Sequence, residues 1–325
     1  MLSYSTISRR NCLNSQSVMH SATLLLRTLS DKYDGELRRD LQRIIAYITY
    51  LPSWRLLCED VALNDDQIHD ILNMWRRRCD GEPLSKIFNR REFYQHVFYV
   101  NKDVLDPRPE SELIVDNVIL YCKNATREVN ILEIGVGSGA ILFSVLSALS
   151  YSSGVGIDVS DAALAVASIN AHQILSSSYE HRCLLLHKNI DAFSLSDIPS
   201  EWCRSDDYSV GVDVIISNPP YIAWHERWNI EDSVLHYDPH EALFADDNGL
   251  AVYKKIADRS VYLAREGARM FLEIAPWMVD HLVQLFAYKR AIMWPRHVYA
   301  FWRVESIHRD LSGQNRMIEL QLCYA

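Results

Sequence analysis

The stretch that decides the fold reads Val129-Asn130-Ile131-Leu132-Glu133-Ile134-Gly135-Val136-Gly137-Ser138-Gly139. Its apolar run over 129–134 predicts a buried strand, which the glycines end, and residues 140–149 predict a helix. Glycines at such a turn let the backbone lie against a ligand, and the first amides of the helix face that ligand. We therefore expect residues 135–139 to form a binding loop.

The segments that follow alternate between strand and helix. Apolar patterns predict strands over 154–157, 183–187, 212–217 and 268–274, and helices over 161–175 and 250–265. This alternation favours an α/β fold, with a mostly parallel sheet covered by helices on both faces. At the end of the chain, the turn Asp310-Leu311-Ser312-Gly313 joins two further strands, 298–307 and 317–322, and predicts an antiparallel hairpin that closes the sheet.

The chain before residue 109 has another pattern. Apolar spacings of three and four predict helices over 21–29, 35–51 and 65–78, the last of which starts after Asn64. Phe93, Val97, Phe98 and Val100, with Asn101-Lys102-Asp103 as a turn, predict a short strand pair or hairpin. We therefore expect a leader over 1–20, a helical substrate-recognition domain over 21–91, a hairpin linker over 92–108 and the sheet-containing domain over 109–325.

The composition excludes several classes of protein. The chain has 325 residues, 49% of them apolar, which fits two globular domains. Its net charge of -9 argues against nucleic acid as the main partner. The seven cysteines form no CxxC or Cys/His cluster, so we expect neither a zinc site nor a disulfide framework. No window approaches the apolar run that a membrane span needs.

Asp158 ends the predicted strand that follows the glycine loop, about twenty residues further on, where a carboxylate can accept hydrogen bonds from ribose hydroxyls. Three interpretations are open at this point. The glycines also fit a dinucleotide fingerprint or a tight turn without a ligand. Their spacing after an acidic residue resembles the first motif of class I methyltransferases, with Asp158 as the ribose-binding acid.

Asn218-Pro219-Pro220-Tyr221 follows the predicted strand 212–217 and therefore lies at the same edge of the sheet as the glycine loop. The proline carbonyls and the Asn218 side-chain oxygen are fixed acceptors. They suit a planar –NH2 group, whose hydrogens they hold while its nitrogen faces a sulfonium methyl group, and the Tyr221 ring can cover that group. A rigid turn after a core strand is the alternative. A dehydrogenase has no use for these acceptors.

Asn-Pro-Pro-Tyr occurs in methyltransferases that act on amide or exocyclic amino nitrogens. The rest of the chain resembles one such group, the release factor glutamine methyltransferase family, from about residue 20 to the end. The segments that carry the resemblance are Arg76–Leu84, Glu92–Tyr94, Phe98–Val100, Pro107–Glu112, Tyr237–Leu243, Asp247–Leu250 and Asp310–Arg316. Two departures are Ser111 in place of the usual threonine and the lack of a glycine after Glu273 in Glu273-Ile274-Ala275-Pro276.

The resemblance implies a class I methyltransferase domain with a Rossmann-like sheet, preceded by a small helical domain. It implies S-adenosylmethionine as the methyl donor, S-adenosylhomocysteine as the product and no metal. Asn218, Pro219, Pro220 and Tyr221 would bind the substrate and carry the catalysis, and Asn218 would also face the donor. Asn189 and Ile190 would lie near the adenine, which puts an amide where the family commonly has an acid. The alternative is a one-residue shift, which makes Asp191 that acid.

The acceptor that the resemblance implies is the N5 nitrogen of the glutamine in the Gly-Gly-Gln motif of peptide chain release factors. Three alternatives remain: a glutamine of a ribosomal protein, an exocyclic amino group in DNA or RNA, and a binding module without activity. We expect a monomer in the cytoplasm, as for a bacterial-type enzyme, that binds no membrane and no nucleic acid. The arginines and serines of the first thirty residues also fit a mitochondrial transit peptide, which makes the matrix the alternative; a disordered or misassigned start is the interpretation we favour.

Overall fold

The computed structural model describes residues 20–30, 35–176, 179–202, 211–293 and 298–325. These residues form two compact units, and the chain passes from the first to the second between Phe88 and Asn89. Residues 1–19 of the predicted leader lie outside the described residues, and with them the question of a targeting signal. The four-part domain division stays a prediction.

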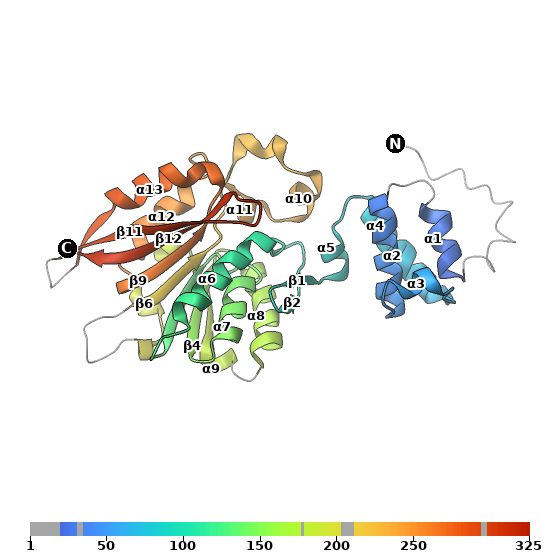
Figure 1. Cartoon of the computed structure of the whole chain (residues 1–325), viewed down its shortest axis with the longest axis horizontal. Helices are drawn as coiled ribbons and strands as arrows, with labels where there is room; N and C mark the ends of the chain where they lie inside the picture. Colours follow the sequence, from blue (N-terminus) through green and yellow to red (C-terminus); the bar gives the residue numbers. More distant parts are fainter. Residues whose placement is uncertain (1–19, 31–34, 177–178, 203–210, 294–297) are drawn as a thin grey trace. The chain divides into compact units, whose positions relative to one another are not determined.

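The first unit is helical in its described residues (Figure 1, blue). The three predicted helices are confirmed to within two residues at each end, and two short helices, α3 and α5, were not predicted. The bounds are α1 (Ala22–Ser30), α2 (Gly35–Thr49), α3 (Arg55–Cys58), α4 (Asp65–Cys79) and α5 (Leu84–Phe88).

One apolar core holds these helices together. The side chains of Leu41, Ile44 and Ile45 from α2 pack with Ile71 and Trp75 from α4, and each of them is buried. The repeat of three and four residues places such side chains on one face of each helix. Their burial removes apolar surface from water, which stabilises the unit.

The second unit begins with an antiparallel hairpin of β1 (Arg91–Phe93) and β2 (His96–Phe98). The chain does turn at 101–103, but this is not the turn of the hairpin as predicted. The hairpin turns at Tyr94, whose φ is 53°. Asn101 instead follows the second strand, and its side-chain oxygen accepts the Asp103 N–H at 2.9 Å. Asparagine forms such local turns readily, so the same signal fits either position.

An eight-stranded sheet forms the centre of the second unit, in the order β10-β11-β12-β9-β6-β3-β4-β5. The strands β5, β4, β3, β6 and β9 run parallel, whereas β12, β11 and β10 are antiparallel. The predicted α/β fold with a C-terminal antiparallel hairpin is thereby confirmed. The bounds are β3 (Val129–Ile134), β4 (Ser152–Asp158), β5 (Cys183–His187), β6 (Val212–Ser217), β9 (Ala264–Glu273), β10 (Arg290–Met293), β11 (Val298–Arg309) and β12 (Asn315–Tyr324).

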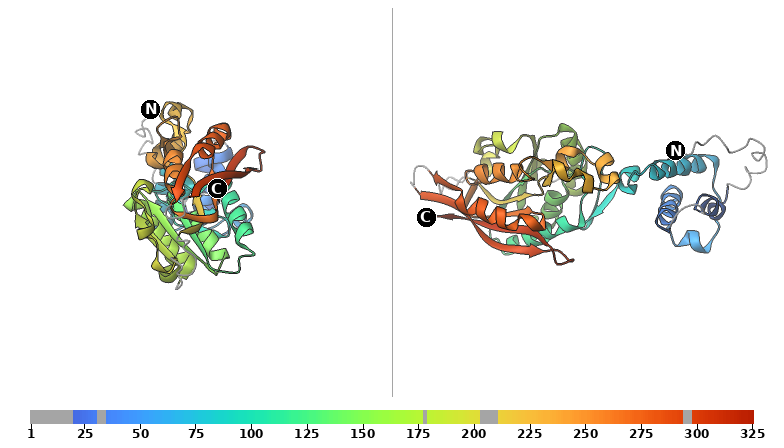
Figure 2. Two further views of the ribbon diagram at one scale, coloured as in Figure 1. Left: turned by 90° about the vertical axis from the view of Figure 1, so that its left-hand side faces the viewer. Right: turned by 90° about the horizontal axis from the view of Figure 1, so that it is seen from above.

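Helices cover both faces of this sheet (Figures 1 and 2). On one face lie α6 (Glu112–Cys122), α7 (Ala140–Ala148) and α8 (Asp161–Leu175), drawn in green, and on the other lie α12 (Ala251–Ser260) and α13 (Val279–Tyr288), drawn in orange. Each face has its own buried apolar cluster. The smaller elements are α9 (Tyr179–Arg182), α10 (Asp232–Tyr237), α11 (His240–Leu243) and a parallel pair, β7 (Ile222–Ala223) with β8 (Phe244–Ala245).

The boundary between α12 and β9 differs from the prediction. A helix was expected over 250–265, but α12 ends at Ser260 and β9 already begins at Ala264. Leu263 and Ala264 are buried in the sheet cluster, so their apolar character serves the strand. A short apolar run fits a buried strand as well as a helix, and the sheet decides between them.

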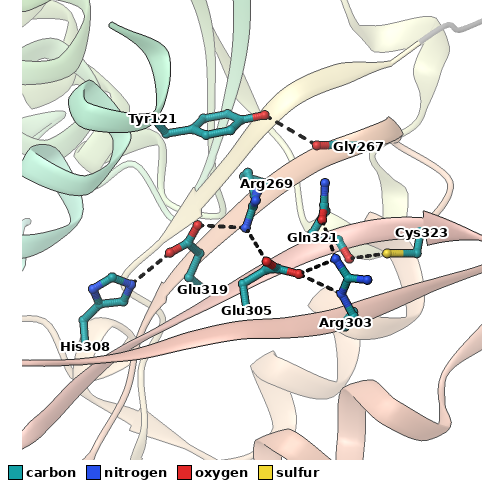
Figure 3. A network of polar contacts seen from close by, with 9 residues as sticks. All are labelled: Tyr121, Gly267, Arg269, Arg303, Glu305, His308, Glu319, Gln321 and Cys323. Atoms are coloured by element: carbon teal, nitrogen blue, oxygen red, sulfur yellow. Dashed lines mark hydrogen bonds and ion pairs between the residues drawn. The ribbon is translucent and has the colours of Figure 1, made fainter. Parts of the chain in front are cut away.

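Charged side chains cover part of the antiparallel half of the sheet (Figure 3). Arg269 on β9 lies 3.0 Å from Glu319 on β12 and 3.3 Å from Glu305 on β11. Its guanidinium also lies over the Tyr121 ring of α6, 5.5 Å from the centroid, and His308 contacts Glu319 at 2.9 Å. Near the C-terminal end of α6, the surface of the sheet is therefore covered by paired charged side chains and not by apolar ones.

The start of α4 allows a test of the first unit. Asn64 accepts the Gln67 N–H at 2.8 Å, and the Gln67 side chain accepts the Asn64 N–H at 3.1 Å, which is a capping box. Asn64→Ala should lower the free energy of opening of α4 by about 1 kcal/mol, because the first turn loses an N–H acceptor. Hydrogen exchange of the α4 amides should then be about fivefold faster.

The matched control is Asp70→Ala, which changes an exposed side chain inside the same helix. Its exchange should be no faster than that of the unmodified chain, because alanine favours helix. Equal exchange in Asn64→Ala and in the control would contradict the role of the cap.

Candidate active site

The two predicted loops meet at the carboxyl ends of β3 and β6, which are parallel neighbours. Ile134, the last residue of β3, pairs with Ser217, the last residue of β6. The Ser217 hydroxyl donates to the Ile134 carbonyl at 2.6 Å, so the two strand ends are tied together. Gly135 and Asn218, the residues that follow, therefore begin the two loops side by side.

The glycine loop has a backbone that only glycine adopts easily. Gly135, Gly137 and Gly139 have φ values of 74°, 53° and 79°. A side chain at Gly139 would start 1.9 Å from the Phe143 ring, whereas a Cβ atom at Gly135 or Gly137 would meet no atom within 4 Å. The first two glycines thus border open space that side chains would fill, as expected for a loop that lies against a ligand.

Asp158 is bound to this loop. Its carboxylate accepts the Gly137 N–H at 2.8 Å and the Ser160 N–H at 3.0 Å. Burial raises the pKa of Asp158 above its ordinary value, and these backbone hydrogen bonds oppose the rise because they favour the charged form. The carboxylate is therefore fixed at the end of β4, on the same side as the loop.

A cavity of about 300 Å³ joins the two loops. Among its lining residues are most of those predicted for the site: Gly135, Val136, Gly137, Ser138, Asp158, Asn189, Ile190, Asn218, Pro219 and Pro220. The structure places Gly139 directly before α7 and not among the lining residues. It places Asp191 outside the lining, in an ion pair with Lys255 at 2.9 Å. Asn189 and Ile190 thus line the cavity, and their contact with the adenine stays a prediction.

The Asn218 side chain is held by a hydrogen bond to Ser111. Its amide nitrogen donates to the Ser111 hydroxyl at 3.1 Å, and that hydroxyl donates to the Glu273 carboxylate at 2.5 Å. Ser111 and Glu273 are both buried. In the sequence, Ser111 was noted as a departure and Glu273 only as the start of a segment that lacks a glycine, and neither was connected with Asn218. No local signal could make this connection, because Ser111 lies 107 residues before Asn218.

Tyr221 does not line the cavity and is half-buried against the apolar core of the second unit. Burial raises the pKa of its hydroxyl to about 12. Gly249, whose φ is 84°, permits close packing here, because a Cβ atom at that position would lie 2.1 Å from the Tyr221 carbonyl oxygen. The predicted contact of the Tyr221 ring with the acceptor stays a prediction.

Other lining residues were quoted in the sequence only as parts of segments. Arg108 pairs with Asp238 at 2.9 Å, which joins Pro107–Glu112 to Tyr237–Leu243 at the cavity. Trp224 follows the acceptor motif and is half exposed. Its ring stacks on that of Phe244, with 4.7 Å between the ring centroids, and it is not among the lining residues. Three of the segments that carried the resemblance, Glu92–Tyr94, Pro107–Glu112 and Tyr237–Leu243, thus contribute lining residues to one cavity.

Glu133 is a buried carboxyl group at the wall of the cavity, with 1% of its surface exposed. It accepts the Leu142 N–H at 3.1 Å. Burial raises the pKa of Glu133 well above its ordinary value, and the neighbouring Asp158 carboxylate raises it further. The group therefore retains its proton at pH values where an exposed glutamate is charged.

The described residues show neither a metal site nor a helix that could span a membrane. They contain no group of three or more histidine, cysteine, aspartate or glutamate side chains placed to hold a metal ion. None of their helices combines the length and the apolar character that a bilayer-spanning helix needs.

Comparison with curated proteins finds similar sequences. The chain is 32% identical over 269 residues to a release factor glutamine methyltransferase of Lactococcus lactis, across 83% of the chain and 88% of the relative. It is 35% identical over 215 residues to one of Caulobacter vibrioides, across 65% and 68%. It is 30% identical over 285 residues to a bifunctional methyltransferase of Rickettsia bellii, across 80% of the chain and 46% of the relative. The chain thus spans about half the length of that last relative.

A solved structure, a release-factor-specific protein-(glutamine-N5) methyltransferase of Alicyclobacillus acidocaldarius, matches 66% of the chain and 93% of its own length. The identity is 24% and the TM-score 0.37. No protein-family model matches the chain.

The buried Glu133 carboxyl gives a pH-dependent prediction. Its pKa is higher in the folded chain than its ordinary value of 4.5, so the folded state retains a proton that the unfolded chain releases. The contribution of Glu133 to the stability of the unmodified chain therefore falls as pH rises above about 4.5. Glu133→Gln does not titrate and should be the more stable protein at about pH 8, with the difference in melting temperature vanishing at about pH 4.

Thermal unfolding without methyl donor measures this difference. Glu266→Gln, at an exposed position, is the control and should shift the melting temperature little at either pH. A Glu133→Gln advantage of equal size at both pH values would show that the carboxyl charge is not the cause.

Proposed function

The chain belongs to the release factor glutamine methyltransferase family, and from this premise we propose that it methylates the side-chain amide nitrogen of a glutamine in a peptide chain release factor. The methyl donor is S-adenosylmethionine, and the acceptor is the glutamine of the Gly-Gly-Gln motif. The second unit has the class I methyltransferase fold, with the mostly parallel sheet that this fold requires.

The observation that carries the proposal is that one cavity connects the glycine loop with Asn218, Pro219 and Pro220. A transfer between two bound molecules needs both binding surfaces to face one space. The tie between Ser217 and Ile134 sets the distance between them before any ligand arrives. The residues present therefore fit a donor on one side and a planar amide on the other.

Three parts of the cavity fit the donor. The open space beside Gly135 and Gly137 accepts a ligand against the backbone, and the Asp158 carboxylate is an acceptor for ribose hydroxyls. Asn189 and Ile190 also line the cavity and would contact the adenine. When bound, S-adenosylmethionine supplies a methyl group on a positively charged sulfur.

Asn218 and the two prolines act on the acceptor. The Asn218 side-chain oxygen and a backbone carbonyl of the motif hold the two hydrogens of the glutamine –NH2 group, which aims its nitrogen. Both acceptors also stabilise the positive charge that grows on this nitrogen during the reaction. The nitrogen is neutral before the reaction, so no strong base has to act first, and its extra proton leaves to solvent afterwards.

The substrate assignment is tested with labelled methyl donor and four acceptors: release factor, ribosomal protein, DNA and RNA. Label should appear in the release factor only, and a release factor with the Gly-Gly-Gln glutamine changed should remain unlabelled. Label in DNA, RNA or ribosomal protein instead would replace the proposed substrate by that one. No label in any of them would contradict the activity.

Asp158→Ala should weaken binding of S-adenosylmethionine by about 10- to 100-fold, because the ribose loses a charged acceptor. Calorimetry measures the dissociation constant directly. Asp280→Ala, an exposed change in the first turn of α13, is the control and should leave it unaltered. Equal affinity of Asp158→Ala and the control would remove Asp158 from the donor site.

Asn218→Ala should slow the methyl transfer by about 100-fold or more, since the contact strengthens as charge builds on the nitrogen. Asn218→Asp keeps an acceptor oxygen and should retain part of the rate. Single-turnover methylation of a release factor measures the step, beside donor affinity on the same variants. Asn117→Ala is the control, because its amide donates to the Leu113 carbonyl within α6 and does not line the cavity.

A normal rate at saturating donor, together with a large loss of donor affinity, would place Asn218 in the donor pocket alone. A rate for Asn117→Ala as low as that of Asn218→Ala would point to a general loss of structure.

A further inference from the structure

Three side chains from distant parts of the second unit form a chain of hydrogen bonds that ends at the cavity. Asn218 follows β6, Ser111 ends the short 3-10 helix η1 (Pro109–Ser111), and Glu273 is the last residue of β9. The Asn218 amide nitrogen donates to Ser111 Oγ at 3.1 Å, and Ser111 Oγ donates to Glu273 Oε2 at 2.5 Å. Asn218 and Ser111 line the cavity, whereas Glu273 does not.

We propose that Ser111 and Glu273 are positioning residues, which turn the Asn218 side-chain oxygen toward the acceptor glutamine. This proposal rests on the proposed function, because it concerns how the same site holds its amide substrate. Glu273 acts only through Ser111, and Ser111 acts only through Asn218.

The direction of the hydrogen bonds follows from the chemistry of the three groups. A charged carboxylate can only accept, so Glu273 takes the single hydroxyl hydrogen of Ser111. Ser111 Oγ is then left as an acceptor and can bind only the –NH2 end of the Asn218 amide. The amide oxygen therefore points the other way, and within the described part of the chain this nitrogen-to-Ser111 bond is the one that the Asn218 side chain makes.

The orientation decides what Asn218 can do. The glutamine –NH2 group of the substrate offers hydrogens and needs acceptors. A rotated Asn218 amide would present its own –NH2 group, and two donors would then face each other. An uncharged or absent Glu273 would permit this rotation, because Ser111 could give its hydrogen to the Asn218 oxygen.

Glu273 is anchored so that its carboxylate stays in reach of Ser111. The Tyr253 hydroxyl donates to the Glu273 carbonyl at 2.6 Å, and β9 is paired on both sides, with Glu273 opposite Met317 of β12. The next residue, Ile274, donates its N–H to the Arg316 carbonyl at 2.8 Å. The carboxylate position is thus fixed by backbone contacts.

Several charged and titratable groups act on Glu273. Arg316 on β12, held by Asp310 at 3.1 Å, favours the charged form, as does Arg108 before α6. Glu110 disfavours it, and Tyr221 and Tyr253 lie close enough to interact. Burial is the largest effect and raises the pKa of Glu273 to about 7, although the hydrogen bond from Ser111 favours the charged form and lowers it. The carboxyl group therefore loses its charge as pH falls through about 7. The Ser111 hydroxyl is then no longer required to donate its hydrogen to Glu273 and can donate it to Asn218.

The test uses single-turnover methylation of a release factor with saturating donor, beside the dissociation constant of the donor. Ser111→Ala should slow the transfer about tenfold or more, because Asn218 loses the partner that orients it, and should change donor affinity less than twofold. Ser111→Thr keeps the hydroxyl and should restore most of the rate. Ser144→Ala, which removes another buried hydroxyl, in α7, is the matched control.

Glu273→Gln gives a second, independent readout. The rate of the unmodified chain should fall on the acid side of about pH 7. Glu273→Gln keeps a neutral acceptor for Ser111, so its rate should be lower at about pH 8 but should not change between about pH 8 and pH 6. This pH profile also decides the matter if Ser111→Ala does not fold.

The proposal is overturned if Ser111→Ala transfers methyl at the normal rate, if Ser111→Thr is as slow as Ser111→Ala, or if Glu273→Gln retains the acid fall in rate. The unmodified chain tests the proposed function by itself, since absence of transfer to any release factor would contradict that function. The ratios of variant to unmodified rates test the positioning residues alone.

Discussion

The parallel pairing of β3 with β6 is the constraint on which the site depends. The register places Ile134 opposite Ser217, and the Ser217 hydroxyl closes the pair with a hydrogen bond to the Ile134 carbonyl. The glycine loop and the acceptor motif both leave the sheet at this point. Their separation is therefore a property of the sheet, whose strands are buried between two layers of helices, and not of flexible loops.

The same edge gathers residues that serve the site indirectly. The ion pair of Arg108 with Asp238 joins the segment before α6 to the segment after the acceptor motif. Glu273 at the end of β9 reaches Asn218 through Ser111. Polar groups buried in this way cost free energy unless they are paired, and these are paired with each other. Their arrangement favours one orientation of the Asn218 amide over the other.

Much of this fold could be predicted from the sequence, because its signals are local. The strands 129–134 and 212–217 and the helix 161–175 have the predicted bounds, since each is a run of one periodicity ended by glycine, proline or a capping residue. The hairpin turn at Tyr94 was misplaced, because no glycine or asparagine marks it, and the end of α12 was misplaced because an apolar run fits either structure. The link from Glu273 to Asn218 could not be predicted from local patterns, since only the folded sheet brings these residues together.

The central claim is that the cavity presents a glutamine side-chain amide to the methyl donor. Fragment-ion mass spectrometry of a release factor, taken after incubation with this protein and S-adenosylmethionine, tests it most directly because it locates the added methyl group. The account predicts one methyl group on the side-chain nitrogen of the Gly-Gly-Gln glutamine. A methyl group on any other residue, or an unmodified release factor after complete incubation, would contradict it.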